Sequence, residues 1–241
     1  MRLRKAEYTL DSFLEEIAAN ADEIFGNTDE RKWLKTYVMY CKHDWLHFFE
    51  KFNPEKNGDL YYLSIPNVKE DNAPSEYYVT EFDEGLLMFF TAATQKDYES
   101  TLQDYIKRKR GITEMWIPPD TFRRVRNYII DNYQASIYFF IAKRQWSSKV
   151  SAHYRPEYNR TIHYFADDGN YAINEFEFLY GVVPTVLDFR MGGDTVRVSN
   201  EGLFSVRSLN RRMLRMVVDV VANILSEQVQ LRKVSTSIET Q

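Results

Sequence analysis

The chain has 241 residues, a formal net charge of −4, 44% apolar residues and nine glycines. This composition is typical of a globular protein and excludes collagen-like, low-complexity and intrinsically disordered classes. Because acidic residues outnumber basic ones, the chain as a whole does not attract phosphate or anionic membranes. Contact with nucleic acid therefore requires a local basic patch.

The N-terminus, the apolar runs and the single cysteine indicate the compartment. The basic start Met1–Lys5 is not followed by the continuous apolar run of a signal peptide. The longest apolar stretch, residues 85–93, is about half the length of a membrane-spanning helix. Cys41 has no second cysteine to pair with, and its apolar neighbours favour a buried thiol. We expect a cytoplasmic protein without a membrane partner.

The N-terminal part is predicted to form a helical hairpin. A first helix begins near Thr9 and ends at Gly26, with its apolar residues on one face. A second helix is predicted from Asp29 to Phe52, because aromatic and aliphatic residues recur there at helical spacing. A breaker cluster follows, and residues 60–65 have the composition of a strand.

From residue 76 onwards, hairpins alternate with helices. We expect a hairpin before residue 96, then strands at 112–117, 135–142, 161–165, 182–191, 195–199 and 203–207, and helices at 96–110, 119–133 and 209–231. Residues 144–160 are predicted to be a long connection, a kind of loop that is often functional. The alternation favours a sheet covered by helices, with at least one right-handed parallel crossover.

The predicted fold class is α+β (mixed α/β): an N-terminal helical hairpin, a mixed sheet with helices packed on it, and a long C-terminal helix. The polar segment between 66 and 76 is the best domain boundary. It separates residues 1–66, a helical region with a short strand, from the mixed α/β domain at 76–241.

Two acidic turns that end in glycine divide this larger domain. They lie at Phe82–Leu87 and Ser199–Phe204, each between β-like runs and each followed by a helix. Two hairpin-helix halves, 76–144 and 160–232, are therefore one interpretation, and chance recurrence of Glu-Gly-Leu is the other.

Two basic clusters are candidate nucleic-acid contacts. The first contains Lys107 and Arg108, with Arg123 and Arg124 of the next helix. Cations in the last turn before Gly111 also complement the helix dipole, so this cluster has a structural explanation as well.

The second cluster is Arg207, Arg211, Arg212 and Arg215, near the start of the C-terminal helix. A solvated helix face is its ordinary interpretation. Positive charge has no dipole rationale at a helix N-terminus, so this cluster is the stronger candidate.

An acidic group supports an alternative. Asp167, Asp168 and Asp188 would bind Mg²⁺ for phosphodiester hydrolysis if they converged. However, Asp167-Asp168-Gly169 is also a turn signal. His43 and His47 share a helical face in the predicted second helix, but no third metal ligand is evident.

One short segment resembles a known signature. Arg190–Val196 is similar over seven residues to the Gly-Gly hairpin of diguanylate cyclases and polymerase-palm domains. The partner motifs of that family are not found upstream, and Thr195 replaces its usual glutamate. A Gly-Gly turn of type I′ between two β runs is a sufficient explanation of the segment.

The sequence contains no phosphate loop, nucleophile elbow or Cys/His cluster. Its pattern favours a binding or regulatory module that contacts nucleic acid through local basic patches, without a catalytic residue or a cofactor. The first alternative is a metal-dependent phosphodiesterase or nuclease with Mg²⁺. The second is a structural subunit of an assembly, with a protein partner or a homo-oligomer.

Overall fold

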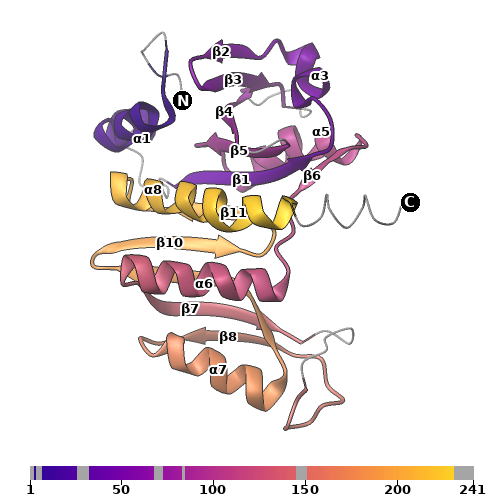
Figure 1. Cartoon of the computed structure of the whole chain (residues 1–241), viewed down its shortest axis with the longest axis vertical. Helices are drawn as coiled ribbons and strands as arrows, with labels where there is room; N and C mark the ends of the chain where they lie inside the picture. The colour runs from indigo at the N-terminus through magenta and orange to yellow at the C-terminus, as the bar shows by residue number, and fades with distance from the viewer. Residues whose placement is uncertain are drawn as a thin grey trace. The chain divides into compact units, whose positions relative to one another are not determined.

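The computed structural model of the chain describes residues 3, 7–25, 33–67, 73–82, 85–144 and 151–230. The chain forms two compact units (Figure 1). Met1–Met115 and Ser205–Gln241 make up the first unit, and Trp116–Phe204 make up the second. The second unit is thus inserted in sequence between two segments of the first.

Helices of the first unit come from both of its segments. They are α1 (Leu10–Ala19), α2 (Ala21–Phe25), α3 (Trp45–Phe49), α4 (Gln95–Tyr98), α5 (Asp104–Lys107) and α8 (Arg211–Val220). The 3-10 turn η1 (Glu50–Phe52) follows α3, and the π-helical turns η2 (Glu99–Gln103) and η3 (Val221–Leu225) continue α4 and α8. The predicted first helix and the long C-terminal helix are both confirmed.

Strands of the first unit form antiparallel ladders. They are β1 (Leu34–Cys41), β2 (Glu55–Asn57), β3 (Leu60–Ile65), β4 (Ser75–Glu81), β5 (Leu86–Thr91) and β6 (Ile112–Glu114). Their order is β2-β3-β4-β5-β1, and β6 pairs with β1. Since β3 pairs with β4, the predicted boundary between residues 66 and 76 lies inside this unit. Strand β11 (Leu203–Val206) leads the chain back into it.

The predicted second helix, from Asp29 to Phe52, is wrong. Its centre is strand β1, and only α3 and η1 are helical. Strand β1 pairs with β5 and β6, and six of its eight residues are buried, so both of its faces are covered. A strand buried on both faces gives a nearly continuous apolar run, which sequence periodicity does not distinguish from a helix. His43 and His47 therefore do not share the predicted helix.

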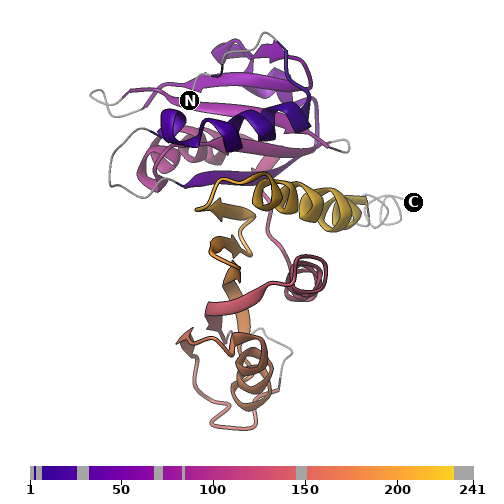
Figure 2. The ribbon, with the colours of Figure 1, turned by 90° about the vertical axis from the view of Figure 1, so that its left-hand side faces the viewer.

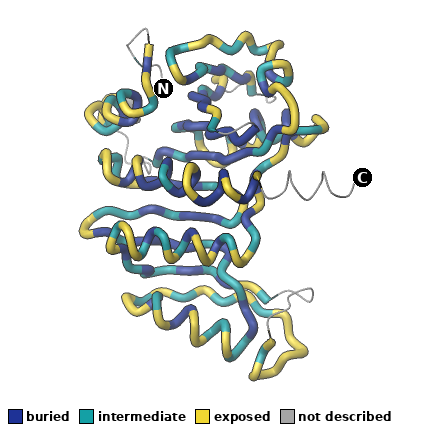
Figure 3. The backbone as a smooth tube through the Cα atoms, in the orientation of Figure 1, coloured by how far each residue is buried: buried dark blue, intermediate teal, exposed yellow. Residues whose placement is uncertain are grey.

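Both faces of the first unit's sheet are covered. Phe13 of α1 packs against Tyr78 and Phe90, each with ring centroids 5.1 Å apart. The neighbouring residue Phe89 points to the opposite face, where it contacts Phe49 of α3 at 5.7 Å. Figure 2 shows α1 lying across this sheet, and Figure 3 shows β5 buried along its length. The core of the unit therefore consists of two aromatic layers separated by the sheet.

The turn that closes on Gly85 is held against β1. Gly85 has φ +89°, and its carbonyl accepts a 2.7 Å hydrogen bond from the Cys41 amide. Asp83 and Glu84 lie outside the described residues. In the second acidic turn Gly202 also has a positive φ, +74°. Both glycines thus occupy the left-handed position that the sequence predicts.

In the second unit, a helix followed by two strands occurs twice along the chain. It comprises α6 (Pro119–Tyr133), β7 (Ser136–Lys143), β8 (Thr161–Phe165), α7 (Gly169–Tyr180), β9 (Val183–Met191) and β10 (Asp194–Ser199). The strand order is β10-β9-β7-β8, so the first strand of each repeat lies at the centre. This repeat differs from the predicted halves 76–144 and 160–232.

The helices of the second unit lie on one face of its sheet. A Cβ at Gly169 of α7 would lie 2.4 Å from the carbonyl oxygen of Ile137 on β7. Helix α6 packs on β9, where Phe122 and Leu187 line one shallow pocket. Arg123 of α6 pairs with Glu177 of α7. The described ladders within both units are antiparallel, so the predicted parallel crossover is wrong.

The hairpin between β9 and β10 differs from the predicted type I′ turn. Gly192 has φ +63°, whereas Gly193 has no positive φ. A positive φ at the first central residue alone is typical of a type II′ turn.

Among the described residues, no helix is long and apolar enough to cross a membrane.

Alanine at Gly85 is expected to destabilise the chain more than alanine at Gly192. Both positions have positive φ, which costs about 1–2 kcal/mol for a residue with a Cβ. At Gly192 nothing lies within 4 Å of an added Cβ, but at Gly85 the Cys41 carbonyl oxygen would be 2.0 Å away. Urea unfolding should show about 1–3 kcal/mol of additional loss for Gly85→Ala. Equal losses would contradict this close approach.

Candidate functional site

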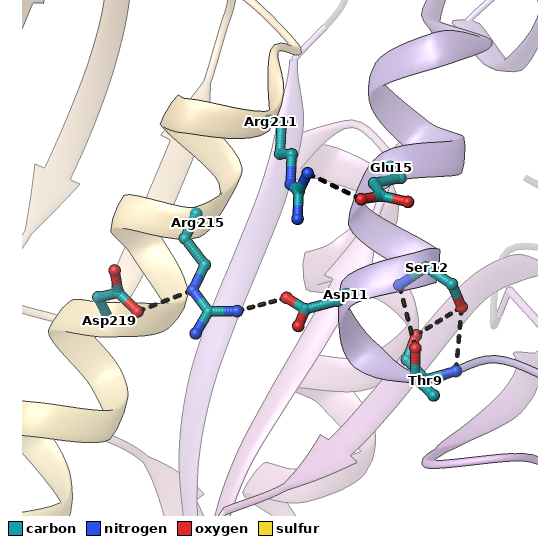
Figure 4. Close-up of polar contacts among 7 residues, drawn as sticks. All are labelled: Thr9, Asp11, Ser12, Glu15, Arg211, Arg215 and Asp219. Carbon is teal, nitrogen blue, oxygen red and sulfur yellow. Dashed lines mark hydrogen bonds and ion pairs between the residues drawn. The ribbon is translucent and has the colours of Figure 1, made fainter.

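The arginines of the C-terminal helix are engaged by α1. Arg211 pairs with Glu15 at 2.9 Å, and Arg215 pairs with Asp11 and, at 3.0 Å, with Asp219 (Figure 4). Asp11 and Glu15 lie one turn apart on α1, and Arg211 and Arg215 lie one turn apart on α8. This match in spacing gives Arg211 and Arg215 a structural role as ion-pair partners of α1, which the sequence pattern does not reveal.

The other two arginines of this cluster, Arg207 and Arg212, are exposed. The opposite face of α8 carries an apolar stripe of buried residues, including Met213, Met216 and Val217. The apolar stripe is thus part of the chain's own core and does not argue for a homo-oligomer. A carboxylate of α1 already pairs with each of Arg211 and Arg215, so a phosphate would compete with that carboxylate.

The arginines of α6 fasten two helices together. Arg123 contacts Asp120 at 3.2 Å in addition to Glu177, and Arg126 donates to the Asn174 side chain at 3.4 Å. Arg126 is half-buried, and this burial lowers the pKa of its guanidinium. Arg124 is exposed on the same helix. These contacts give Arg123 and Arg126 structural roles, so their positive charge does not by itself indicate a ligand.

The acids of the nuclease alternative each have a different partner. Asp188 is buried and accepts two 2.7 Å hydrogen bonds from Arg197. Asp167 pairs with Arg190 at 2.9 Å, and Asp168 accepts a hydrogen bond from Tyr164. No group of three His, Cys, Asp or Glu side chains in the described part of the chain is placed to hold a metal ion. The arrangement gives the magnesium hypothesis no support.

Lys107 and Arg108 belong to a group of cations that extends beyond their own helix. A cavity of about 450 Å³ in the first unit is lined by Lys51, Phe52, Tyr105, Arg108 and Lys109, among others. We call these five residues and their cavity the basic hollow. Lys107 and Arg110 are exposed beside it in sequence. Turn η1 supplies Lys51, the residues that directly follow α5 supply Arg108 and Lys109, and the end of β3 adds Ile65.

The floor of the basic hollow is aromatic. The rings of Phe52 and Tyr105 meet edge to face, with centroids 4.9 Å apart. The Lys51 ammonium lies 4.3 Å from the Tyr105 centroid and 4.5 Å from that of Phe52, and Lys109 lies 5.3 Å from Tyr105. These cation–π contacts hold two ammonium groups beside the cavity. Aromatic packing thus orients the charges that line the hollow.

Contacts within the first unit fix this floor in place. The buried Tyr105 donates its hydroxyl to the carbonyl oxygen of Phe48, and its ring packs against Phe49 at 5.5 Å. Gly111, four residues beyond the end of α5, has φ +97°, and its carbonyl accepts a 2.7 Å hydrogen bond from the Lys42 backbone amide. The segment after α5 is therefore joined to the turn that follows β1.

The charge of the hollow favours an anionic ligand. Its lining includes three cations and one carboxylate, Asp104, which Arg108 already binds at 2.8 Å. Lysine and arginine at the end of α5 offset the helix dipole, and Lys51 stands in the last turn of η1, so each segment also gives its cations a structural role. Sequence reasoning missed Lys51, since its approach to Lys109 depends on how two distant segments pack.

A second cavity of the first unit is less suited to phosphate. It has a volume of about 390 Å³, and its lining includes Glu76 and Asp97 but no lysine or arginine. Nearby, Tyr37 and Tyr98 stack with centroids 3.6 Å apart, and burial raises the pKa of both well above the ordinary tyrosine value. Both phenols therefore remain protonated, and this network serves as core.

Comparisons with known proteins place the second unit in a wider context. The family model AF_0896_M, described as a family middle domain, matches residues 121–200. This match falls inside the second unit, Trp116–Phe204.

One relative extends beyond that unit. The chain is 26% identical over 174 residues to a protein of Archaeoglobus fulgidus named "Uncharacterized protein". The match covers 70% of this chain and 42% of the relative, so the chain spans less than half of that protein's length. No solved structure matches the chain significantly.

A double-mutant cycle on Arg211→Gln and Glu15→Gln should reveal a small coupling. Both side chains are more than half exposed, so we expect about 0.2–1 kcal/mol from urea unfolding, decreasing as salt is added. The matched control pairs Arg211→Gln with Glu55→Gln on β2 and should be additive. A zero coupling at low salt would show that α1 does not neutralise Arg211.

Proposed function

We propose that the chain is a nucleic-acid-binding module and that the basic hollow of its first unit contacts the phosphate backbone. Lys51 and Lys109 would bind phosphate oxygens, with Lys107 and Arg110 beside them and with Arg108, which also pairs with Asp104, at the same cavity. One observation carries the proposal. Cations from two separate segments gather around a single aromatic-floored cavity, although the chain as a whole is acidic.

The electrostatics favour local binding over general attraction. With a net charge of −4 the chain does not collect nucleic acid over its entire surface. Contacts should therefore be few, and affinity should depend on the counterions released at those contacts. The lysines of the hollow differ from Arg211 and Arg215 of α8, because carboxylates of α1 and α8 pair with the guanidinium groups of those two arginines.

The chemistry proposed for the hollow is binding and not catalysis. Arg108 is permanently charged, and the two lysines are oriented by rings rather than by a reacting group. The one carboxylate in the described lining of this cavity, Asp104, is bound by Arg108 at 2.8 Å, and the lining includes no histidine. This arrangement favours the binding-module hypothesis over the phosphodiesterase alternative.

Neutralising two lysines of the hollow should reduce the salt dependence of binding. For Lys51→Gln with Lys109→Gln, we expect weaker binding to a fluorescein-labelled single-stranded oligouridylate in anisotropy titrations. The slope of log affinity against log salt should fall by about 1.4, because each lost phosphate contact removes about 0.7 on a single strand. The titrations would span about 50 to 200 mM salt.

The matched control is Lys56→Gln with Lys96→Gln. It removes the same charge from exposed positions of the first unit outside the hollow. This control should keep the wild-type slope. Equal slopes for wild type and the hollow variant would refute the proposed contact, and an absence of binding at low salt would refute the proposed function.

A further inference from the structure

The connection before β8 is fastened to the end of helix α7. The amides of His153 and Tyr154 both donate to the Leu179 carbonyl, at 3.0 and 2.8 Å. From the other end of the connection, Arg160 donates from its guanidinium to the Tyr154 carbonyl at 3.2 Å. Residues 151–160 therefore form an ordered loop on α7, which we call the α7 loop.

Rings and guanidinium groups alternate within the α7 loop. The Arg160 guanidinium lies 4.9 Å from the Tyr180 centroid and 5.5 Å from the Tyr154 centroid. The Arg155 guanidinium lies 5.3 Å from the same Tyr154 ring. This alternation joins Tyr180, Arg160, Tyr154 and Arg155 in a series of cation–π contacts. Arg155 is exposed, so its planar group forms an accessible end of the series.

Further flat surfaces lie exposed beside this series. Tyr158 is 57% exposed and Phe178 of α7 is 61% exposed. The His153 ring stacks on Phe178, with centroids 4.3 Å apart and the planes at 24°. Figure 3 shows that the described loop is exposed over most of its length. Single exposed aromatic side chains are ordinary on a protein surface, so it is their combination here with the guanidinium groups of one loop that points to a ligand.

The charge of the α7 loop indicates an anionic partner. Its sequence contains Arg155 and Arg160 but a single carboxylate, that of Glu157. An uncharged apolar partner would leave exposed guanidinium groups without compensation. A chain of phosphates with flat bases satisfies both requirements, because bases stack on aromatic rings and on guanidinium planes.

We infer that the α7 loop is a stacking platform for the bases of single-stranded nucleic acid. Bases would lie on Tyr158, on the Arg155 guanidinium and on the exposed Phe178 ring, while Arg155 offsets backbone charge. Duplexes hide their base faces, so the platform selects single strands. The inference rests on the proposed function only in requiring that the chain bind nucleic acid, since these residues belong to the second unit.

Two variants test the platform in the full-length chain. Tyr158→Ala removes an exposed ring, and Arg155→Lys retains the charge but removes the planar group. Anisotropy titrations with labelled oligouridylate should show at least about fivefold weaker binding for Tyr158→Ala, as expected for one lost stacking contact. Arg155→Lys should also bind more weakly, with an unchanged salt slope. Tyr158→Phe retains the ring and should bind as the wild type does.

The matched control is Tyr171→Ala, which removes another exposed tyrosine of the second unit. It should leave affinity unchanged. An abasic oligonucleotide supplies the second arm, in which Tyr158→Ala should bind as tightly as the wild type while Lys51→Gln with Lys109→Gln still weakens binding.

The outcomes separate the two proposals. Wild-type affinity in both Tyr158→Ala and Arg155→Lys would overturn the platform and leave the basic hollow standing. An equal loss for Tyr158→Ala on the abasic strand would also overturn it, because the ring would then act without bases. No binding of any strand by the wild type would overturn both.

Discussion

The first unit depends on the burial of both faces of its sheet. Phe13 covers one face through Tyr78 and Phe90, and Phe49 covers the other through Phe89. Each such aromatic side chain removes about 150–250 Å² from water, so these layers dominate the energetics of the unit. The basic hollow follows from the same packing, because its floor residue Tyr105 rests on Phe49.

Charge pairing then decides which basic residues remain suited to a ligand. Carboxylates of α1 neutralise Arg211 and Arg215, and Glu177 neutralises Arg123. In the hollow the lysines are instead held by rings, which orient an ammonium without cancelling its charge. The proposed contacts with nucleic acid thus include cations that lie against aromatic rings, Lys51 and Lys109 in the first unit and Arg155 in the second.

The sequence predicts elements with a clear period and fails where burial removes it. Helix α6 and strand β8 have their predicted bounds, since proline at the first helical turn and alternating polarity mark them. Strand β1 was missed because burial on both faces erased its alternation. Lys107 and Arg108 were found as a run of charge, and residues 151–160 fall in the long connection that the sequence predicts, but Lys51 and the cation–π contacts of the α7 loop depend on how residues pack in space.

Ultraviolet cross-linking of the full-length chain to oligouridylate, followed by peptide mass spectrometry, would locate the contacts directly. The account predicts cross-linked peptides that contain residues 151–160 and residues around Lys51 or Lys109. Cross-links confined to Arg207, Arg211, Arg212 and Arg215 on the C-terminal segment would contradict it, because those arginines would then bind nucleic acid despite their ion pairs with α1.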